Sequence, residues 1–102
     1  MNTLNKGINM LNFTNMNYID LKAFTKKKTI FCALNSNAFC MSYEGKNRFL
    51  QKDGLALLSL QEELYKTFNL KQKLRYFFIK NALCSKAKTI LEEKGFICSY
   101  VI

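Results

Sequence analysis

The chain has 102 residues, 49% of them hydrophobic, and its 16 basic and 7 acidic side chains give a formal charge of +9 at pH 7. This length predicts a single domain that can bury a core without disulfides or a structural metal. The charge favours a polyanionic partner, and it favours nucleic acid over an anionic membrane surface. No run of 18 apolar residues is present, so we expect no membrane partner.

The first half of the chain predicts strands. Residues 1–17 are rich in Asn and are interpreted as an N-terminal extension of a domain spanning 18–102. Residues 18–24 suggest a first strand, and a basic turn follows at 26–28. The segments 29–34 and 38–43 are typical of strands, and the Asn-containing link between them favours a hairpin. Centred on Ser36, this hairpin is expected to pair Cys32 with Cys40 and Phe31 with Met41.

The second half predicts two helices and two strands. Apolar residues at helical spacing indicate a helix over 54–68, with Asp53 as its N-cap and Asn69 at its end. A strand over 74–80, a helix over 85–94 capped by Ser85, and a strand over 96–102 follow. Gly95 suits a left-handed C-cap. The fold class is therefore α/β: a mixed five-stranded-type sheet with an N-terminal hairpin, a C-terminal β-α-β unit and two packed helices.

The residues that usually carry enzyme chemistry are sparse. The chain has no His, and the adjacent pairs Glu62/Glu63 and Glu92/Glu93 do not face each other on a helix. Four Cys, at 32, 40, 84 and 98, lack the close spacing of zinc ligands and are interpreted as buried thiols in a reducing compartment. We expect no enzyme activity, metal, cofactor or small-molecule substrate.

Basic residues gather in three connections, at 26–28, 46–52 and 80–88. Lys and Arg neutralise phosphates, while Asn, Gln and Ser donate hydrogen bonds to them. The aromatic residues at 76–78 could stack on bases, but a central strand favours their packing in the core. These connections predict a nucleic-acid-binding protein.

The order of elements and several short motifs resemble a known family. Over 18–102 the chain is similar to small-subunit ribosomal protein eleven, the universal platform protein. The matching segments are Lys27-Lys28-Thr29-Ile30-Phe31-Cys32-Ala33, Asn37-Ala38-Phe39-Cys40-Met41 with Gly45 following, Arg48-Phe49-Leu50-Gln51-Lys52, Leu57-Leu58-Ser59-Leu60-Gln61, 69–80 and Ile90-Leu91-Glu92-Glu93-Lys94-Gly95-Phe96-Ile97. The family's Gly-Pro-rich turn is replaced by Asn81-Ala82-Leu83-Cys84, and its basic tail has no counterpart.

The resemblance implies a structural constituent of the small ribosomal subunit that binds rRNA on the platform, near the mRNA exit. The implied partners are small-subunit rRNA, neighbouring platform proteins and mRNA near the exit. The RNA-binding residues implied are Lys27, Lys28, Asn35, Lys46, Asn47, Arg48, Gln51, Lys52, Lys80, Ser85, Lys86 and Lys88.

The composition suggests where the protein works. Fourteen Lys against two Arg, with eleven Asn and no Pro, are typical of an AT-rich gene. Residues 1–17 resemble neither a secretory nor a transit peptide. We therefore expect the protein in a mitochondrial ribosome of the matrix, and favour this location over a plastid or an AT-rich bacterial cytoplasm.

Two other interpretations stay open. One is a different small ribosomal α/β protein, because 85–102 loosely resembles the opening region of ribosomal protein eight. The other is an accessory protein-interaction subunit of an organellar respiratory complex, which can also be small and basic.

Overall fold

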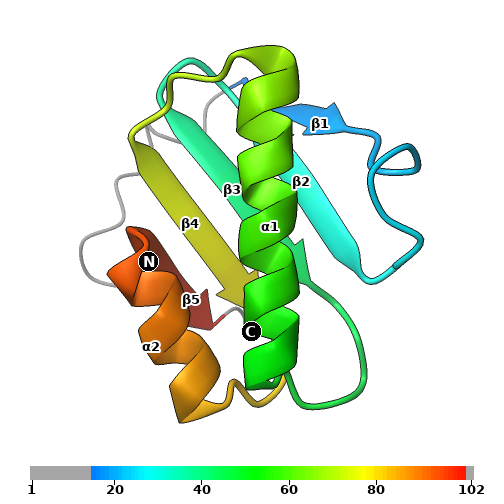
Figure 1. Cartoon of the computed structure of the whole chain (residues 1–102), viewed down its shortest axis with the longest axis vertical. Helices are drawn as coiled ribbons and strands as arrows, with labels where there is room; N and C mark the ends of the chain where they lie inside the picture. Colours follow the sequence, from blue (N-terminus) through cyan, green and yellow to red (C-terminus); the bar gives the residue numbers. More distant parts are fainter. Residues whose placement is uncertain (1–14, 101–102) are drawn as a thin grey trace.

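A computed structural model describes residues 15–100, which form a mixed five-stranded sheet and two helices (Figure 1). The predicted α/β fold class is confirmed. The elements in chain order are β1 Asn17–Ile19, β2 Ile30–Leu34, β3 Ala38–Tyr43, α1 Gln51–Phe68, β4 Leu74–Ile79, α2 Ser85–Glu93 and β5 Phe96–Tyr100.

The strands lie in the sheet in their chain order. Strand β2 pairs antiparallel with both β1 and β3, whereas β3, β4 and β5 run parallel. Two β-α-β units are therefore present: the predicted unit through α2 and, before it, a unit through α1 that joins β3 to β4. Both helices cover the same face (Figure 1), as right-handed crossovers that progress in one direction require.

The main core lies between this face and the helices. Its fully buried side chains include Phe39 and Phe77 of the sheet, Leu64 of α1 and Leu91 of α2. A smaller buried cluster of Ala38, Cys40 and Tyr76 lies on the opposite face, which we call the open face because neither helix covers it. The expectation of core packing for 76–78 therefore holds for Phe77 in the main core and for Tyr76 in the smaller cluster, while Phe78 packs partly buried against that cluster.

The hairpin forms with a register one residue away from the expected one. Cys32 lies opposite Met41 and Phe31 opposite Ser42, so the predicted pairs Cys32–Cys40 and Phe31–Met41 are wrong. The Asn35 backbone N–H donates to the Ala38 carbonyl at 3.0 Å, which leaves a turn of two residues instead of three. Because a one-residue shift exchanges the faces of a strand, Cys32 joins the main core and Cys40 the open face.

Several predicted boundaries also move. The first strand ends at Ile19, because a turn follows in which the N–H groups of Phe24 and Thr25 both donate to the Leu21 carbonyl at 2.9 Å. The domain therefore includes Asn17, which the composition had placed in the extension. Residues 1–14, and 101–102 of the predicted last strand, lie outside the described part.

Both helices begin differently from the prediction. Helix α1 starts at Gln51, and Asp53 is the third residue of its first turn, where its carboxylate accepts the Leu50 N–H at 2.8 Å. Helix α2 has Cys84 at its N-cap, so Ser85 is its first residue and not its cap. The two predicted ends agree in conformation: Asn69 has φ 52° and Gly95 has φ 91°.

Candidate nucleic-acid interface

The three basic connections converge at one end of the sheet. Ile30 opens β2 opposite Tyr43, the last residue of β3, and Tyr43 lies beside Ile79, the last residue of β4. The turn before β2, the loop after β3 and the loop after β4 therefore leave the sheet along the same edge. We call residues 26–28, 44–53 and 80–88 the basic end.

Hydrogen bonds join the three connections directly. The Glu44 N–H donates at 2.8 Å to the carbonyl of Thr29, the residue that follows the first connection, and so ties that connection to the second. Between the second and third, Phe49 donates to the Ala82 carbonyl at 3.0 Å and accepts from the Cys84 N–H at 2.9 Å. The side-chain amide of Asn81 also donates to the Gly45 carbonyl. The basic end is thus one bonded surface.

Phe49 anchors this surface to the core. Its side chain is 1% exposed and lies between two other rings, with centroids 5.0 Å from Tyr43 and 4.9 Å from Phe77. Burial of such a side chain contributes about 1.5–3 kcal/mol of transfer free energy. The loop that carries Lys46 and Arg48 is therefore held in place by an aromatic residue within it.

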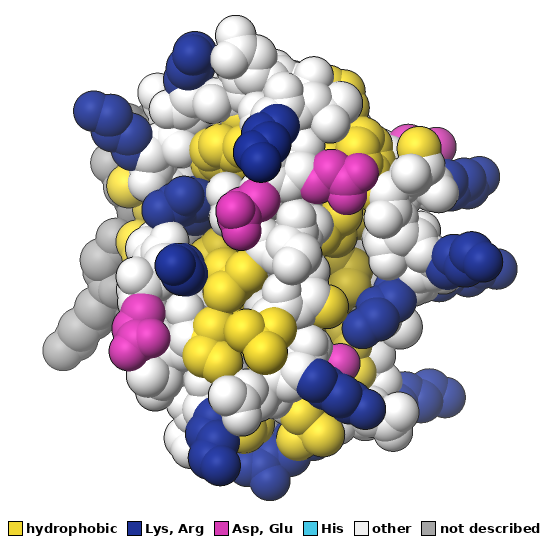
Figure 2. Space-filling model, viewed as in Figure 1, with side chains coloured by type: hydrophobic (Ala, Val, Ile, Leu, Met, Phe, Trp, Pro, Cys, Tyr) yellow, Lys and Arg dark blue, Asp and Glu magenta, His cyan; other side chains and the backbone are white. Residues whose placement is uncertain are grey.

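The charges of the described residues are unevenly distributed. The basic end holds nine cations and two carboxylates, Glu44 and Asp53, whereas the rest of 15–100 holds six cations and five carboxylates. Figure 2 shows Lys and Arg side chains along the lower margin, where both helices begin. Nearly all of the excess positive charge in 15–100 therefore belongs to one end.

Eleven of the twelve predicted RNA-binding residues are exposed at the basic end. They are Lys27, Lys28, Lys46, Asn47, Arg48, Gln51, Lys52, Lys80, Ser85, Lys86 and Lys88. Gln51 and Lys52 belong to the first turn of α1, and residues 85–88 form the first turn of α2. The backbone N–H groups of these turns add partial positive charge to the basic end.

Asn35 is the exception, because it lies apart from the other predicted residues. It lies at the other end of β2, is 9% exposed, and is therefore poorly placed for RNA. Its Oδ1 accepts the backbone N–H groups of Asn37 and Ala38, both at 2.8 Å, and its carbonyl accepts the side-chain amide of Gln72. The residue holds the hairpin turn and the loop before β4.

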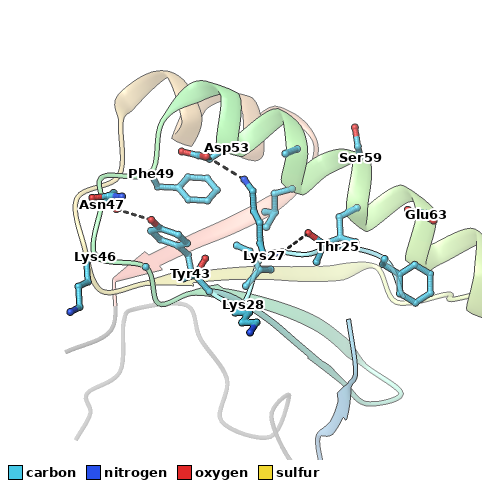
Figure 3. A pocket seen from close by; sticks show the side chains of 17 residues that line it. Thr25, Lys27, Lys28, Tyr43, Lys46, Asn47, Phe49, Asp53, Ser59 and Glu63 are labelled. Atoms are coloured by element: carbon cyan, nitrogen blue, oxygen red, sulfur yellow. Dashed lines mark hydrogen bonds and ion pairs between the residues drawn. The ribbon is translucent and has the colours of Figure 1, made fainter. Parts of the chain in front are cut away.

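A hollow of about 590 Å³ adjoins the basic end, between α1 and the strands (Figure 3). Lys27 extends across it to Asp53, with 3.5 Å between Nζ and Oδ1, and the Tyr43 hydroxyl donates to the Asn47 carbonyl at 2.9 Å. Lys28 and Lys46 point away from α1 in the same view. The two outer lysines are thus available to phosphates, while Lys27 is partly neutralised.

Cys84 lies in the basic end, and its pKa is shifted in the opposite direction from those of the other three thiols. The backbone N–H groups of Ala87 and Lys86 face it and lower its pKa, and Arg48 adds to this effect. The other three thiols behave oppositely, because burial raises the pKa of Cys32 and Cys40 to about 12 and that of Cys98 to about 11. Sequence reasoning missed this difference, because the cap position depends on where α2 begins.

Sequence reasoning also missed the convergence itself. The signal was present: if β3 and β4 are parallel neighbours, the loops after them must leave the same edge of the sheet. Only the last two strands were predicted to be parallel, so the 46–52 and 80–88 connections were treated separately.

Within residues 15–100, no three His, Cys, Asp or Glu side chains are grouped so as to hold a metal ion. No helix in this part of the chain is long and apolar enough to cross a membrane. Comparison with family models, curated proteins and solved structures finds no match to this chain.

Proposed function

We propose that this protein is a structural, RNA-binding constituent of the small ribosomal subunit. The observation that carries the proposal is the convergence of three basic connections and two helix N-termini at one hydrogen-bonded end of the sheet. The resemblance to the platform protein adds the more specific place, on the platform near the mRNA exit. The basic end is the surface that contacts rRNA.

The chemistry at this end is phosphate neutralisation. When its exposed cations contact phosphates, counterions are released from the RNA, and the N–H groups of the first helical turns donate hydrogen bonds to phosphate oxygens. The aromatic rings of Tyr43 and Phe49 contact each other instead of projecting from this end. Recognition here therefore depends on the spacing of phosphates along structured RNA, as in most binding to RNA helices.

The proposal extends to place and partners. The Asn- and Lys-rich composition supports a mitochondrial ribosome, with neighbouring platform proteins and mRNA near the exit as further partners. A protein of this kind needs no active site, cofactor or small-molecule substrate.

Matched charge variants test RNA binding. Changing Lys46, Lys80 and Lys86 together to Ala removes three cations from the basic end, and changing Lys66, Lys71 and Lys73 removes three exposed cations elsewhere. Affinity for a small-subunit rRNA transcript is measured against salt concentration. The first variant is expected to lower the slope by about 0.7–0.9 for each phosphate that it no longer neutralises, and the second to change it little. Equal effects would show that only net charge matters.

A second experiment separates the ribosome from the respiratory-complex alternative. The tagged chain is followed through a density gradient of detergent-solubilised organelles. We expect it to sediment with the small subunit and to leave it at high salt. Recovery with a membrane complex that lacks rRNA would contradict the proposal and favour the accessory-subunit interpretation.

A further inference from the structure

The open face of the sheet carries a small hollow that the basic end does not include. Its volume is about 190 Å³, and three rings stand among its walls: Tyr18 of β1, Phe31 of β2 and Phe78 of β4. Tyr18 is 83% exposed and Phe31 43% exposed. Small side chains contribute to the floor between the rings, among them Ala33, Cys40 and Ser42.

The strand register explains this arrangement. Phe31 lies opposite Ser42, and Ser42 lies beside Phe78, so all three occupy one row across β2, β3 and β4. Two strand spacings separate Phe31 from Phe78, about 10 Å between their backbones. Ser42 lines the hollow between them, and its small side chain leaves room for a planar ring above the sheet.

The hollow lies close to the basic end. Lys80 follows Phe78 by two residues, directly after β4, and Lys28 precedes Phe31 by three, in the turn before β2. Lys46 follows Ser42 by four residues and is exposed at the same edge. A ligand with an aromatic ring and an adjacent negative charge therefore matches the surface.

We propose that this hollow binds an unpaired base of single-stranded RNA, stacked against Phe31 and Tyr18, while the lysines hold its flanking phosphates. The inference rests on the proposed RNA-binding function and extends it from duplex backbone to a single-stranded segment. Exposed aromatic residues on a sheet are a common way to bind unpaired bases, because every base has a face that stacks.

The size of the hollow and the charge around it favour an RNA base over other ligands. Sites for drug-sized ligands occupy about 300–1,000 Å³, so a smaller hollow suits a single ring. An apolar peptide would gain little from Lys28, Lys46 and Lys80, whereas a nucleotide joins an apolar base to an anionic phosphate. The ligand class is therefore a nucleotide within an RNA chain.

The test compares a short oligouridylate with an RNA duplex of the same strand length. Tyr18→Leu and Phe31→Leu remove the rings but keep apolar side chains, and thermal melting verifies that both variants fold. We expect each to weaken oligouridylate binding about five-fold to a hundred-fold, with duplex affinity unchanged. Tyr100→Leu is the matched control: Tyr100 is 53% exposed and pairs with core residue Ile79, so it lies on the helix face.

Crosslinking gives a second measurement that needs no variant. An oligouridylate containing 4-thiouridine is irradiated with the unchanged protein, and crosslinked peptides are located by mass spectrometry. Crosslinks at Tyr18, Phe31 or Phe78 are expected. Full oligouridylate affinity in both Leu variants, or crosslinks confined to other residues, would overturn the hollow as a base site. If the unchanged protein bound neither RNA, the proposed function itself would fail.

Discussion

Asp53 and Lys27 connect the start of α1 to the turn before β2, with 3.5 Å between the carboxylate and the ammonium group. The same carboxylate accepts the Leu50 N–H at 2.8 Å, and the Asp53 N–H donates to the Leu50 carbonyl at 2.9 Å. One side chain thus stabilises the first turn of α1 and neutralises a cation of the proposed RNA surface. Stability and RNA affinity are therefore opposed at this position.

Asp53→Ala should reveal this opposition. We expect the free energy of unfolding to fall by about 1 kcal/mol, because the helix loses an acceptor and a favourable charge in its first turn. RNA affinity should rise about two-fold to five-fold, because Lys27 becomes available and a repelling carboxylate is removed. Urea denaturation and RNA titration measure the two effects.

Glu62→Gln is the control for this change. Glu62 is an exposed carboxylate on the same helix, outside the basic end. It should alter neither quantity by more than a small long-range effect. A fall in RNA affinity on Asp53→Ala would contradict the role given to the ion pair.

Asn35→Ala tests whether Asn35 stabilises the hairpin turn or contacts RNA. The change removes the acceptor of two backbone N–H groups in the hairpin turn, so we expect a loss of about 1–2 kcal/mol in the free energy of unfolding. RNA affinity of the folded fraction should stay the same, because Asn35 lies away from the basic end. Asn37→Ala, at an exposed neighbour in the turn, is the control for stability. A specific loss of RNA affinity would instead show that Asn35 contacts RNA, as the sequence predicts.

The sequence was sufficient to predict the fold class because its local patterns agree with one another. Apolar stripes marked both helices, and Asn69 and Gly95 marked where they end. The hairpin register could not be predicted in the same way. It depends on whether Asn35 closes a two-residue or a three-residue turn, and that choice is made by hydrogen bonds to Asn35 Oδ1 that a propensity does not contain.

In the candidate site, too, local features could be predicted from the sequence and long-range pairing could not. Exposure of the predicted cations follows from their polarity, and the structure places all of them at the surface. Their convergence depends on β3 and β4 being parallel neighbours, which is a long-range pairing. The aromatic hollow depends on the register of three strands, and a change of one residue in β2 would have moved Phe31 to the helix face.

Two glycines should respond in opposite directions to substitution by Ala. A Cβ at Gly54 would make ordinary contacts with Ala87 of α2, 3.5 Å from its Cβ, so Gly54→Ala is expected to stabilise by about 0.5–1 kcal/mol. Gly95 has φ 91°, and a Cβ there would overlap the Arg75 guanidinium, so Gly95→Ala should destabilise by about 1–2 kcal/mol.

The double variant Gly95→Ala with Arg75→Ala separates the two causes at Gly95. It removes the overlap but keeps the backbone strain, and it also removes the hydrogen bond from Arg75 Nη2 to the Lys94 carbonyl at 2.8 Å. A non-additive change in the free energy of unfolding, measured by urea denaturation, is expected from the relieved overlap. Strict additivity would show that only the backbone conformation matters.

The buried thiols predict a loss of stability in alkali. Burial raises the pKa of Cys32 to about 12, with Cys40 adding to the effect, whereas an unfolded thiol titrates near ~8.5. Above that pH the unfolded state releases a proton that the native state retains, so the free energy of unfolding falls as pH rises towards 12 and is unaffected below ~8. The slope should reach about 1.4 kcal/mol per pH unit for each such thiol.

Cys32→Ala should reduce this slope between about pH 9 and 11. Cys84→Ala should leave it unchanged, because a thiol with a lowered pKa is already ionised in both states at that pH. Urea denaturation at several pH values measures both. An equal effect of the two substitutions would show that the slope reports general alkaline unfolding and not the buried thiol.

Cys84 also provides a direct test of where RNA binds. Because its pKa is lowered and those of the other three thiols are raised, it should react first with iodoacetamide near neutral pH. Cys84 begins α2 within the basic end, where Arg48 adds to its lowered pKa. RNA bound there would cover the thiol and bring phosphates near it, and negative charge raises a thiol pKa. Adding rRNA should therefore slow alkylation of Cys84, read by mass spectrometry, with Cys98 as the internal control. Unchanged alkylation of Cys84 at saturating RNA would place the bound RNA on another surface of the protein.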